Sequence, residues 1–371
     1  MDNKFKVFFI SFIFILIFTG VVNKASANDN TRYKGRITNV EVIQSQPYQD
    51  EDWVNQVVTI KLLSGPHKKQ TIDLHHTLTG HPYFDLNVKK GDKVIIQVEE
   101  NETYTEYFIV DFARQTPIIV ITSLFVILVI MIGGRQGIKA IISLIGMGII
   151  IMTMILPLVL KGYNPILVTV GLSSILTGIF IVFIGGFSKK TLAATAGTIG
   201  GLLASGILAV VVGRASYLTG LSSGEAQMLQ YMDASIDFRG LLFSGIIIGA
   251  LGAILDVGIS IASSMEQIKE ADPTTDFKTL FTRGILVGRD LIATMSNTLI
   301  LAYVGSSLPL LLLFQASKSN WGEVFNMELI GAEVVRSMAG SIGLTLAIPI
   351  TAVISALLFV KPQNESEDLG N

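Results

Sequence analysis

Long apolar segments fill the chain between residues 116 and 360 and constrain its fold more than any other feature. An α-helix needs about 17–25 largely apolar residues to cross the hydrocarbon of a bilayer. Only 15% of the residues are charged, against about 25% in soluble domains, which excludes an ordinary soluble enzyme. The sequence therefore predicts an α-helical polytopic membrane bundle over residues 116–361. Seven spans are expected, at residues 116–133, 138–160, 166–187, 191–212, 240–263, 285–307 and 338–360.

The N-terminus has the pattern of an export signal. Two lysines precede an apolar run from Val7 to Val22, and an Ala-Ser-Ala sequence ends at Ala27. This order of charged, apolar and small residues is typical of a signal peptide. Residues 1–27 are therefore predicted to be a signal peptide or, because the apolar run is long, an uncleaved N-terminal anchor. In both cases the chain from residue 28 onward begins outside the membrane.

Residues 28–115 have the composition of a separate domain. Short runs rich in Val, Ile and Phe alternate with polar residues, which is the pattern of half-buried strands. Turn sequences such as Ser64-Gly65-Pro66 and Lys89-Lys90-Gly91-Asp92 separate them. About five strands in a domain of this size predict a small extracytoplasmic β-barrel or sandwich. The runs are RITNVEVIQ, NQVVTIKLL, QTIDL, KVIIQVEE and EYFIVDF.

All four histidines lie in this predicted β-domain, at His67, His75, His76 and His81. Imidazoles that cluster in a sequence are candidate metal ligands. However, the side chains of consecutive strand residues point to opposite faces, so His75 and His76 cannot both face one ion without a bulge. The alternative is that all four are surface histidines beside a strand. No metal or other cofactor is assigned to the chain, which also has no cysteine.

The orientation of the bundle follows from the exported domain. The first span starts outside, so seven spans place the C-terminus and its tail, residues 362–371, in the cytosol. Lys and Arg are more frequent in the segments that this orientation places inside, as the positive-inside rule requires. We expect a multi-pass protein of the cytoplasmic (plasma) membrane. A net charge of −2 gives no reason to expect nucleic acid as a partner.

Charged residues interrupt two of the predicted spans. Asp256 lies in the apolar run GALGAILDVGISIASS, with Ser260 one turn further on. A carboxylate in a span is costly, so it faces the bundle interior or a water cavity and needs a partner. The candidate partner is Arg289, in the sequence GILVGRDLIATMSNTLILAYVG. The alternative is a purely structural ion pair, Asp256–Arg289 or Arg289–Asp290.

The span that carries Arg289 also has a polar face. Asp290, Thr294 and Asn297 recur at i, i+4 and i+7, and therefore lie on one side of a helix. Their carboxylate, hydroxyl and amide oxygens are suited to a hard cation or to passing a proton. These residues, with Asp256, Ser260 and Arg289, are predicted to line a substrate or ion pathway.

The last span opens with a further charged pair. Glu333 and Arg336 are three residues apart, so they can pair on one helix surface. They form either an ion pair at the outer surface or a gate over the predicted pathway. Before them, the span of residues 285–307 is expected to end near Gly305, with Leu308–Phe314 as a re-entrant or interfacial segment.

Small residues in register predict close helix packing. Such residues let the backbones of two helices approach each other. The first stripe is Ala193, Gly197, Gly201, Ser205 and Ala209. The span of residues 240–263 carries Gly245, Gly249 and Ala253 at the same spacing, so the two helices are expected to be neighbours.

Three of these stretches carry a resemblance to a known family. The sequences ILDVGISIASSMEQI, VGRDLIATMSNTLILAYVG and EVVRSMAGSIGLTLAIPITA are similar to those of the YibE/YibF-like family of bacterial multi-spanning membrane proteins. The resemblance implies the layout of a signal-like segment, an outer β-rich domain and a membrane bundle. It implies no activity and no catalytic residues.

The function is predicted from the polar residues of the proposed pathway. The chain has none of the G-x-S-x-G, Walker A or H-E-x-x-H motifs, so no enzyme activity is expected. Intramembrane proteolysis by Asp256 and Asp290 is disfavoured because Arg289 compensates their charge. We expect a permease or channel-like transporter whose partners are the lipid bilayer and a small solute or cation. The alternative is a non-transporting envelope scaffold that binds an envelope protein through the β-domain.

Overall fold

A computed structural model describes residues 32–43, 53–100, 105–232, 235–318 and 320–360. The predicted signal peptide or anchor and the predicted C-terminal tail lie outside these residues. The chain divides into two compact units, Met1–Ile138 and Lys139–Asn371. The first unit therefore contains the sheet together with the start of the first long helix.

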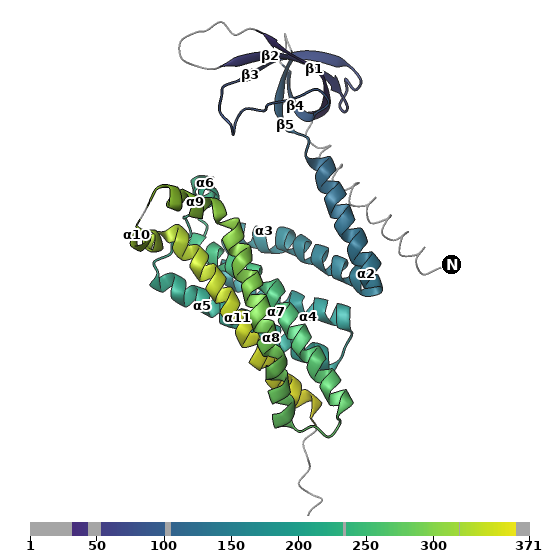
Figure 1. Ribbon diagram of the computed structural model, residues 1–371, viewed down its shortest axis with the longest axis vertical. Helices are drawn as coiled ribbons and strands as arrows, with labels where there is room; N and C mark the ends of the chain where they lie inside the picture. The colour runs from purple at the N-terminus through teal and green to yellow at the C-terminus, as the bar shows by residue number, and fades with distance from the viewer. Residues whose placement is uncertain (1–31, 44–52, 101–104, 233–234, 319, 361–371) are drawn as a thin grey trace, which may run out of the picture. The chain divides into compact units, whose positions relative to one another are not determined.

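Five antiparallel strands form the N-terminal sheet, which curls into a half-barrel (Figure 1). All five predicted strands are confirmed. Among the described residues no ladder joins the two outermost strands, β3 and β5. The strand order is β3-β2-β1-β4-β5, with β1 (Arg32–Ile43), β2 (Val54–Leu62), β3 (Thr71–Leu78), β4 (Lys93–Glu100) and β5 (Thr105–Phe112).

The core of the sheet comes from the alternation seen in the sequence. Along β2, every second side chain from Gln56 to Leu62 is buried. Gly35 in β1 is required by this packing, because a Cβ there would collide with the side chains of Ile60 and Ile96. The apolar core comprises Ile37, Val58, Ile60, Leu62, Leu74, Val88, Val94 and Ile96.

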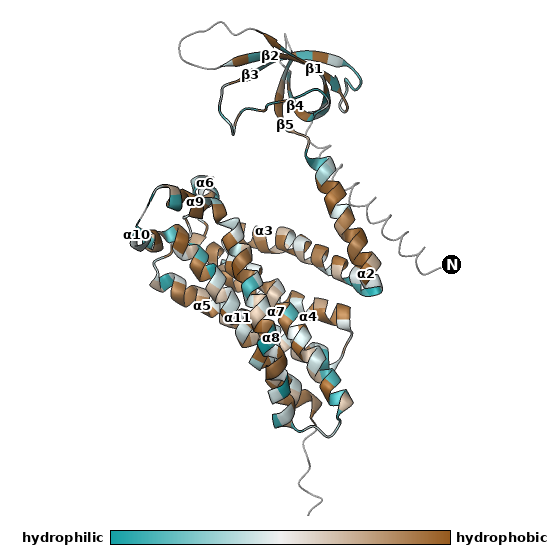
Figure 2. Cartoon of the chain, viewed as in Figure 1, coloured by the Kyte–Doolittle hydropathy of each residue, from teal (hydrophilic) through white to brown (hydrophobic). Residues whose placement is uncertain are grey.

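Helices make up most of the described chain after the sheet. Six of the described helices are long and apolar enough to cross a membrane, and Figure 2 shows the apolar residues along them. The helical membrane bundle predicted from the sequence is therefore confirmed. The elements are α2 (Gln115–Ile150), the π-helical turn η1 (Ile151–Ile155), α3 (Leu156–Leu160), α4 (Pro165–Gly185), α5 (Lys189–Ala215), α6 (Gly224–Met232), α7 (Phe238–Ala271), α8 (Phe277–Ser306), α9 (Leu308–Ala316), α10 (Trp321–Asn326) and α11 (Glu328–Phe359).

The first of the six helices accounts for two of the seven predicted spans. It runs from Gln115 to Leu160 through α2, η1 and α3. A straight helix of that length would measure about 70 Å, more than twice the hydrocarbon thickness. Gly134 breaks it, with φ 55° and ψ −127°. After the break Gly137 lies against the carbonyl of Val129, so the chain turns sharply between two span-length segments.

The segment after α8 is helical. α8 ends at Ser306, beside the predicted end at Gly305. The predicted re-entrant or interfacial segment forms α9, which begins with Pro309 in its first turn. Proline suits that position because the first helical N–H groups have no partner within the helix. At nine residues, α9 is about 13 Å long and too short to span a bilayer.

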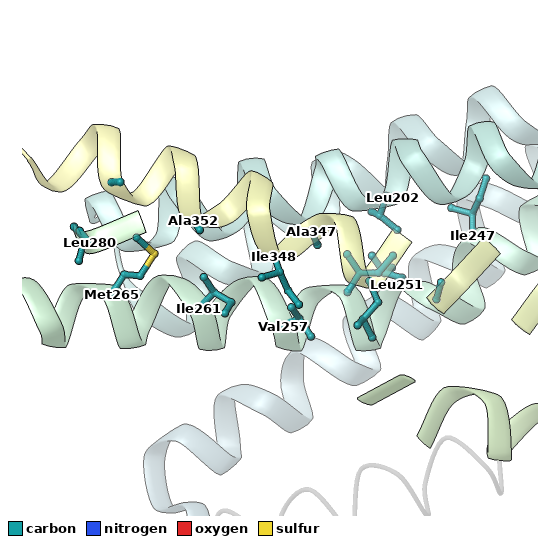
Figure 3. Close-up of a cluster of buried hydrophobic side chains, with 14 residues drawn as sticks. Leu202, Ile247, Leu251, Val257, Ile261, Met265, Leu280, Ala347, Ile348 and Ala352 are labelled. Carbon is teal, nitrogen blue, oxygen red and sulfur yellow. The ribbon is translucent and has the colours of Figure 1, made fainter. Parts of the chain in front are cut away.

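The core of the bundle lies between α5, α7 and α11, with α8 against the last two (Figure 3). Leu251, Val257 and Ile261 of α7 face Ala347, Ile348 and Ala352 of α11 in this cluster. Leu202 enters it from α5 and Leu280 from α8. This apolar face of α7 sets the rotation of the helix, and hence the side on which Asp256 lies.

The predicted stripe of small residues on α5 is buried along its whole length. It packs closely on α11, where Gly201 lies against Ala347 and the carbonyl of Gly343. α5 also neighbours α7, as predicted. The contact does not use the second stripe, since a Cβ at Gly245 would meet nothing within 4 Å. The reason is that Ile247 and Ile254, on the other side of α7, occupy the contact with α5.

Candidate functional site

The relative register of α7 and α8 is fixed by contacts along their length. Gly284 lies against Met265, Gly288 against Ile261, and the Tyr303 hydroxyl against Gly249. Leu299 of α8 and Ala250 of α7 also meet at Gly340 of α11. The two helices are therefore antiparallel, and Asp256 is level with residues 293–296 of α8.

This register separates Asp256 from Arg289. Arg289 is level with residues 260–263 of α7, four to seven residues from Asp256, which is about 6–10 Å along the axis. Among the described residues neither side chain forms an ion pair. The predicted Asp256–Arg289 pair is thus not formed. Arg289 and Asp290 do not pair either, because adjacent helical residues point about 100° apart.

Most of the predicted pathway residues lie on the surface of the described bundle. Asp256, Arg289, Asp290, Thr294 and Asn297 are exposed, and Ser260 is half-buried. The Thr294 hydroxyl donates hydrogen bonds of 3.3 Å to the backbone carbonyls of Asp290 and Leu291, and therefore not to the Asp290 carboxylate. The polar face of α8 is therefore present, but it faces outward from the described helices of the second unit.

The predicted Glu333–Arg336 ion pair is confirmed. Arg336 Nη1 lies 2.6 Å from Glu333 Oε1, and both side chains are partly buried. Because the pair uses only one oxygen of the carboxylate, Glu333 Oε2 is left buried without a hydrogen-bond partner among the described residues. The hydroxyl of Tyr303 is likewise buried without a hydrogen-bond partner among the described residues.

Both unpartnered groups border a pocket of about 180 Å³ between α8, α9, α10 and α11. Its other walls are mainly apolar and include Trp321, Phe325 and Ile330. Such a pocket suits a small molecule with an apolar body and one polar group that donates to Glu333 and accepts from Tyr303. Sequence reasoning missed Tyr303 because a tyrosine in an apolar span carries no pattern of its own.

Comparison with known proteins identifies the family. Residues 121–361 match the family model described as YibE/F-like protein, and residues 29–112 match the YibE/F family N-terminal domain. The chain belongs to the YibE/F-like family. No curated protein and no solved structure matches it. The resemblance found in the sequence is confirmed, and the two family regions correspond to the half-barrel and to the helical bundle.

The histidines of the YibE/F family N-terminal domain do not converge. His75 is exposed on β3, whereas His76 points to the opposite side and its Nε2 lies 2.8 Å from the carbonyl of Leu86. His81 accepts a 3.2 Å hydrogen bond from the backbone N–H of Tyr83, and His67 lies in the turn between β2 and β3. Among the described residues, no three His, Cys, Asp or Glu side chains form a group that could hold a metal ion.

An aromatic loop follows β3 in the same domain. Tyr83 and Phe84 are 83% and 72% exposed, and the ring of His81 lies 4.6 Å from that of Phe84. Asp85 closes the loop by accepting hydrogen bonds from the backbone N–H groups of Thr79 and Gly80. The hydrogen bond from the Thr79 N–H is the main reason that the pKa of Asp85 is lower than usual.

Proposed function

We propose that this multi-pass membrane protein is a permease or channel that moves a small cation, or another small solute, without catalysing a reaction. One observation carries the proposal: Asp256, Arg289 and Asp290 are exposed on membrane-length helices, and among the described residues none of them forms an ion pair. A charge at the centre of a span costs roughly 2.5–3.5 kcal/mol on insertion scales, so it faces water or protein rather than lipid. The pathway residues are Asp256, Ser260, Arg289, Asp290, Thr294 and Asn297.

The chemistry of these side chains favours a cation. Asp256 is level with Thr294 of α8, and Asp290 and Asn297 lie about one turn to either side of Thr294, so carboxylate, hydroxyl and amide oxygens follow one another along the two helices. Hard cations bind through oxygen. Conduction also requires that the ion leave again. The positive charge of Arg289 beside Asp290 weakens cation binding and so favours release.

In the proposed orientation the half-barrel is extracytoplasmic and the protein resides in the bacterial cytoplasmic membrane. The Glu333–Arg336 pair and its pocket then lie toward the outer end of the bundle, with Asp290 in the cytosolic half. The pocket is the outer binding site of this proposal, and the ion pair is its gate.

Ion flux from liposomes tests the proposal. The purified chain is reconstituted in vesicles, and gradients of H⁺, Na⁺ and K⁺ are imposed in turn while an enclosed indicator reports flux. Asp290→Asn and Asp256→Asn are expected to reduce flux, because each removes a charged oxygen ligand. Glu270→Gln is the matched control, since Glu270 is an exposed carboxylate in the last turn of α7. Full flux in the double variant Asp256→Asn/Asp290→Asn would overturn the proposed pathway.

A second candidate function, a partner-binding envelope scaffold, is favoured by the aromatic loop. Exposed Tyr and Phe side chains are enriched at protein interfaces. A photo-reactive amino acid at Tyr83 would form an adduct with an envelope protein in cells, whereas one at exposed Lys61 on β2 would not. A Tyr83→Ser/Phe84→Ser variant that loses the biological phenotype of the gene but keeps ion flux would favour the scaffold.

A further inference from the structure

An exposed seam runs along α8. We define this seam as Leu286, Asp290, Ala293, Asn297, Ile300 and Val304, whose spacing alternates between four and three residues. All are exposed except Ile300, which is half-buried. Spacing of this kind repeats every 3.5 residues and is the pattern of helices that pack side by side over a long distance. The buried face of α8, with Leu280, Gly284, Gly288 and Leu299, is a different one.

α7 presents a second uncovered surface. Gly245, Gly249, Gly252 and Asp256 are exposed and recur at four, three and four residues. A Cβ at Gly245 or Gly252 would meet nothing within 4 Å. Backbones without side chains admit another helix closely. Gly249 lies against the Tyr303 hydroxyl of α8, so within residues 139–360 the open part of this α7 surface is at Gly245 and Gly252, and the seam of α8 is exposed.

The charges on these surfaces complement one another. Arg289 is beside Asp290 at the seam, and neither has an ion pair among the described residues. A surface that carries both signs can bind a copy of itself, since a two-fold axis places each patch opposite the same patch. A partner of a single charge would satisfy only one of the two residues.

We propose that a second copy of this chain covers the seam, with α8 of one copy beside α8 of the other. All copies of a membrane protein insert the same way round, so the two-fold axis is parallel to the bilayer normal and residues meet at their own depth. Arg289 and Asp290 differ in height by only about 1.5 Å. Arg289 of each copy therefore meets Asp290 of the other.

Asn297 fixes the register of the dimer. Its position in the seam places it opposite the same residue of the second copy, where two amides can exchange hydrogen bonds. A single Asn within an apolar seam specifies register and oligomeric state in coiled coils, and amides also join helices in membranes. The dimer axis is then lined by two Asp290 carboxylates and two Asn297 amides. This step rests on the proposed function: the pathway is incomplete in one chain and enclosed by two.

The absence of cysteine allows a direct test by disulfide cross-linking. Ala293→Cys, a small change in the seam, is oxidised in native membranes and is expected to give a covalent dimer, because cysteines can link when their Cα atoms are within about 7 Å. Thr298→Cys is the matched control: Thr298 is also exposed on α8 but lies about 140° around the helix. It is expected to remain monomeric.

Charge exchange tests the predicted pairs. Two chains with different tags are compared, one with Arg289→Asp and one with Asp290→Arg. The first has two negative charges at this position and the second has two positive charges, so like chains repel and unlike chains attract. They are expected to co-purify when expressed together, and neither is expected to co-purify with a differently tagged copy of itself. Equal recovery of like and unlike pairs would reject the Arg289–Asp290 contact.

Other outcomes identify other occupants. An Ala293→Cys variant that stays monomeric after oxidation would overturn the dimer. An intramolecular disulfide in the double variant Thr122→Cys/Ala293→Cys would also overturn it, because the first span of the same chain would then cover α8. The dimer and the transport function fail separately. A cross-linked dimer without ion flux would support the interface and reject the transport function. Ion flux from a chain that never cross-links would support transport and reject the dimer.

Discussion

Replacing Gly201 by alanine tests how closely α5 and α11 approach each other. A Cβ at Gly201 would lie 2.7 Å from Ile254 Cγ2, 2.8 Å from Ala347 Cβ and 2.8 Å from the carbonyl oxygen of Gly343. The approach is reciprocal, because a Cβ at Gly343 would lie 2.8 Å from the carbonyl oxygen of Gly201. Neither carbonyl can rotate away without breaking its helix. One methyl group therefore forces α5 away from two helices at once.

The magnitude follows from the overlap. To reach an ordinary contact of 3.4 Å, the neighbours of the new Cβ must retreat by about 0.6 Å. Overpacking of this kind costs about 1–3 kcal/mol, whereas replacing a helical glycine by alanine returns at most about 1 kcal/mol. Gly201→Ala is expected to destabilise the folded chain, and Gly201→Leu to do so far more.

Gly171→Ala on α4 is the matched control, because a Cβ there would meet nothing within 4 Å. The gain in helix propensity is common to both variants, so the difference between them isolates the collision. Thermal unfolding in detergent should place Gly201→Ala below Gly171→Ala by about 2–4 °C for each kcal/mol. Equal melting temperatures would refute the claim that the stripe is packed backbone to backbone.

Three further predictions concern other parts of the chain. Gly134→Ala should lower the melting temperature, because the backbone conformation of Gly134 costs a residue with a side chain about 1–3 kcal/mol. Gly133→Ala, at a neighbouring helical position, should not lower it. Arg336→Ala should cost about 1.5–3 kcal/mol by removing a charged hydrogen bond from Glu333, and denaturation should show that Glu333→Gln/Arg336→Met recovers most of that loss. Since the pKa of folded Asp85 is below its unfolded value of 3.8, its loop is stabilised above that pH and loses this stability as the pH falls through the folded pKa. Hydrogen exchange of the Gly80 amide, corrected for its intrinsic rate, should rise on acidification in the wild type but not in Asp85→Asn.

Local patterns were sufficient for the elements. The five strands followed from alternation of apolar residues, and the spans from the length of apolar runs, because both signals arise within a few turns of chain. The division of the first helix at Gly134 also agrees with the charged break that separated two predicted spans. The Glu333–Arg336 pair was predictable for the same reason, since a separation of three residues places both side chains on one helix face.

Contacts between distant segments were not predictable in this way. The stripes on α5 and α7 have the same spacing, yet Gly201 is buried against α11 while Gly245 is open. Which stripe is covered depends on the competing fit of Ile247, Ile254 and the other buried residues of their cluster, which come from four helices. The pocket beside Tyr303 likewise needs four helices to assemble.

The sequence by itself determined that this chain has an N-terminal β-domain and a helical membrane bundle with charged residues within its spans. Only the tertiary structure decided that Asp256 and Arg289 are separated along α7 and α8, and that the polar face of α8 points outward. The physical reason is that helical periodicity fixes which residues share a face. The rotation and register of that face, in contrast, depend on the packing of all the helices together.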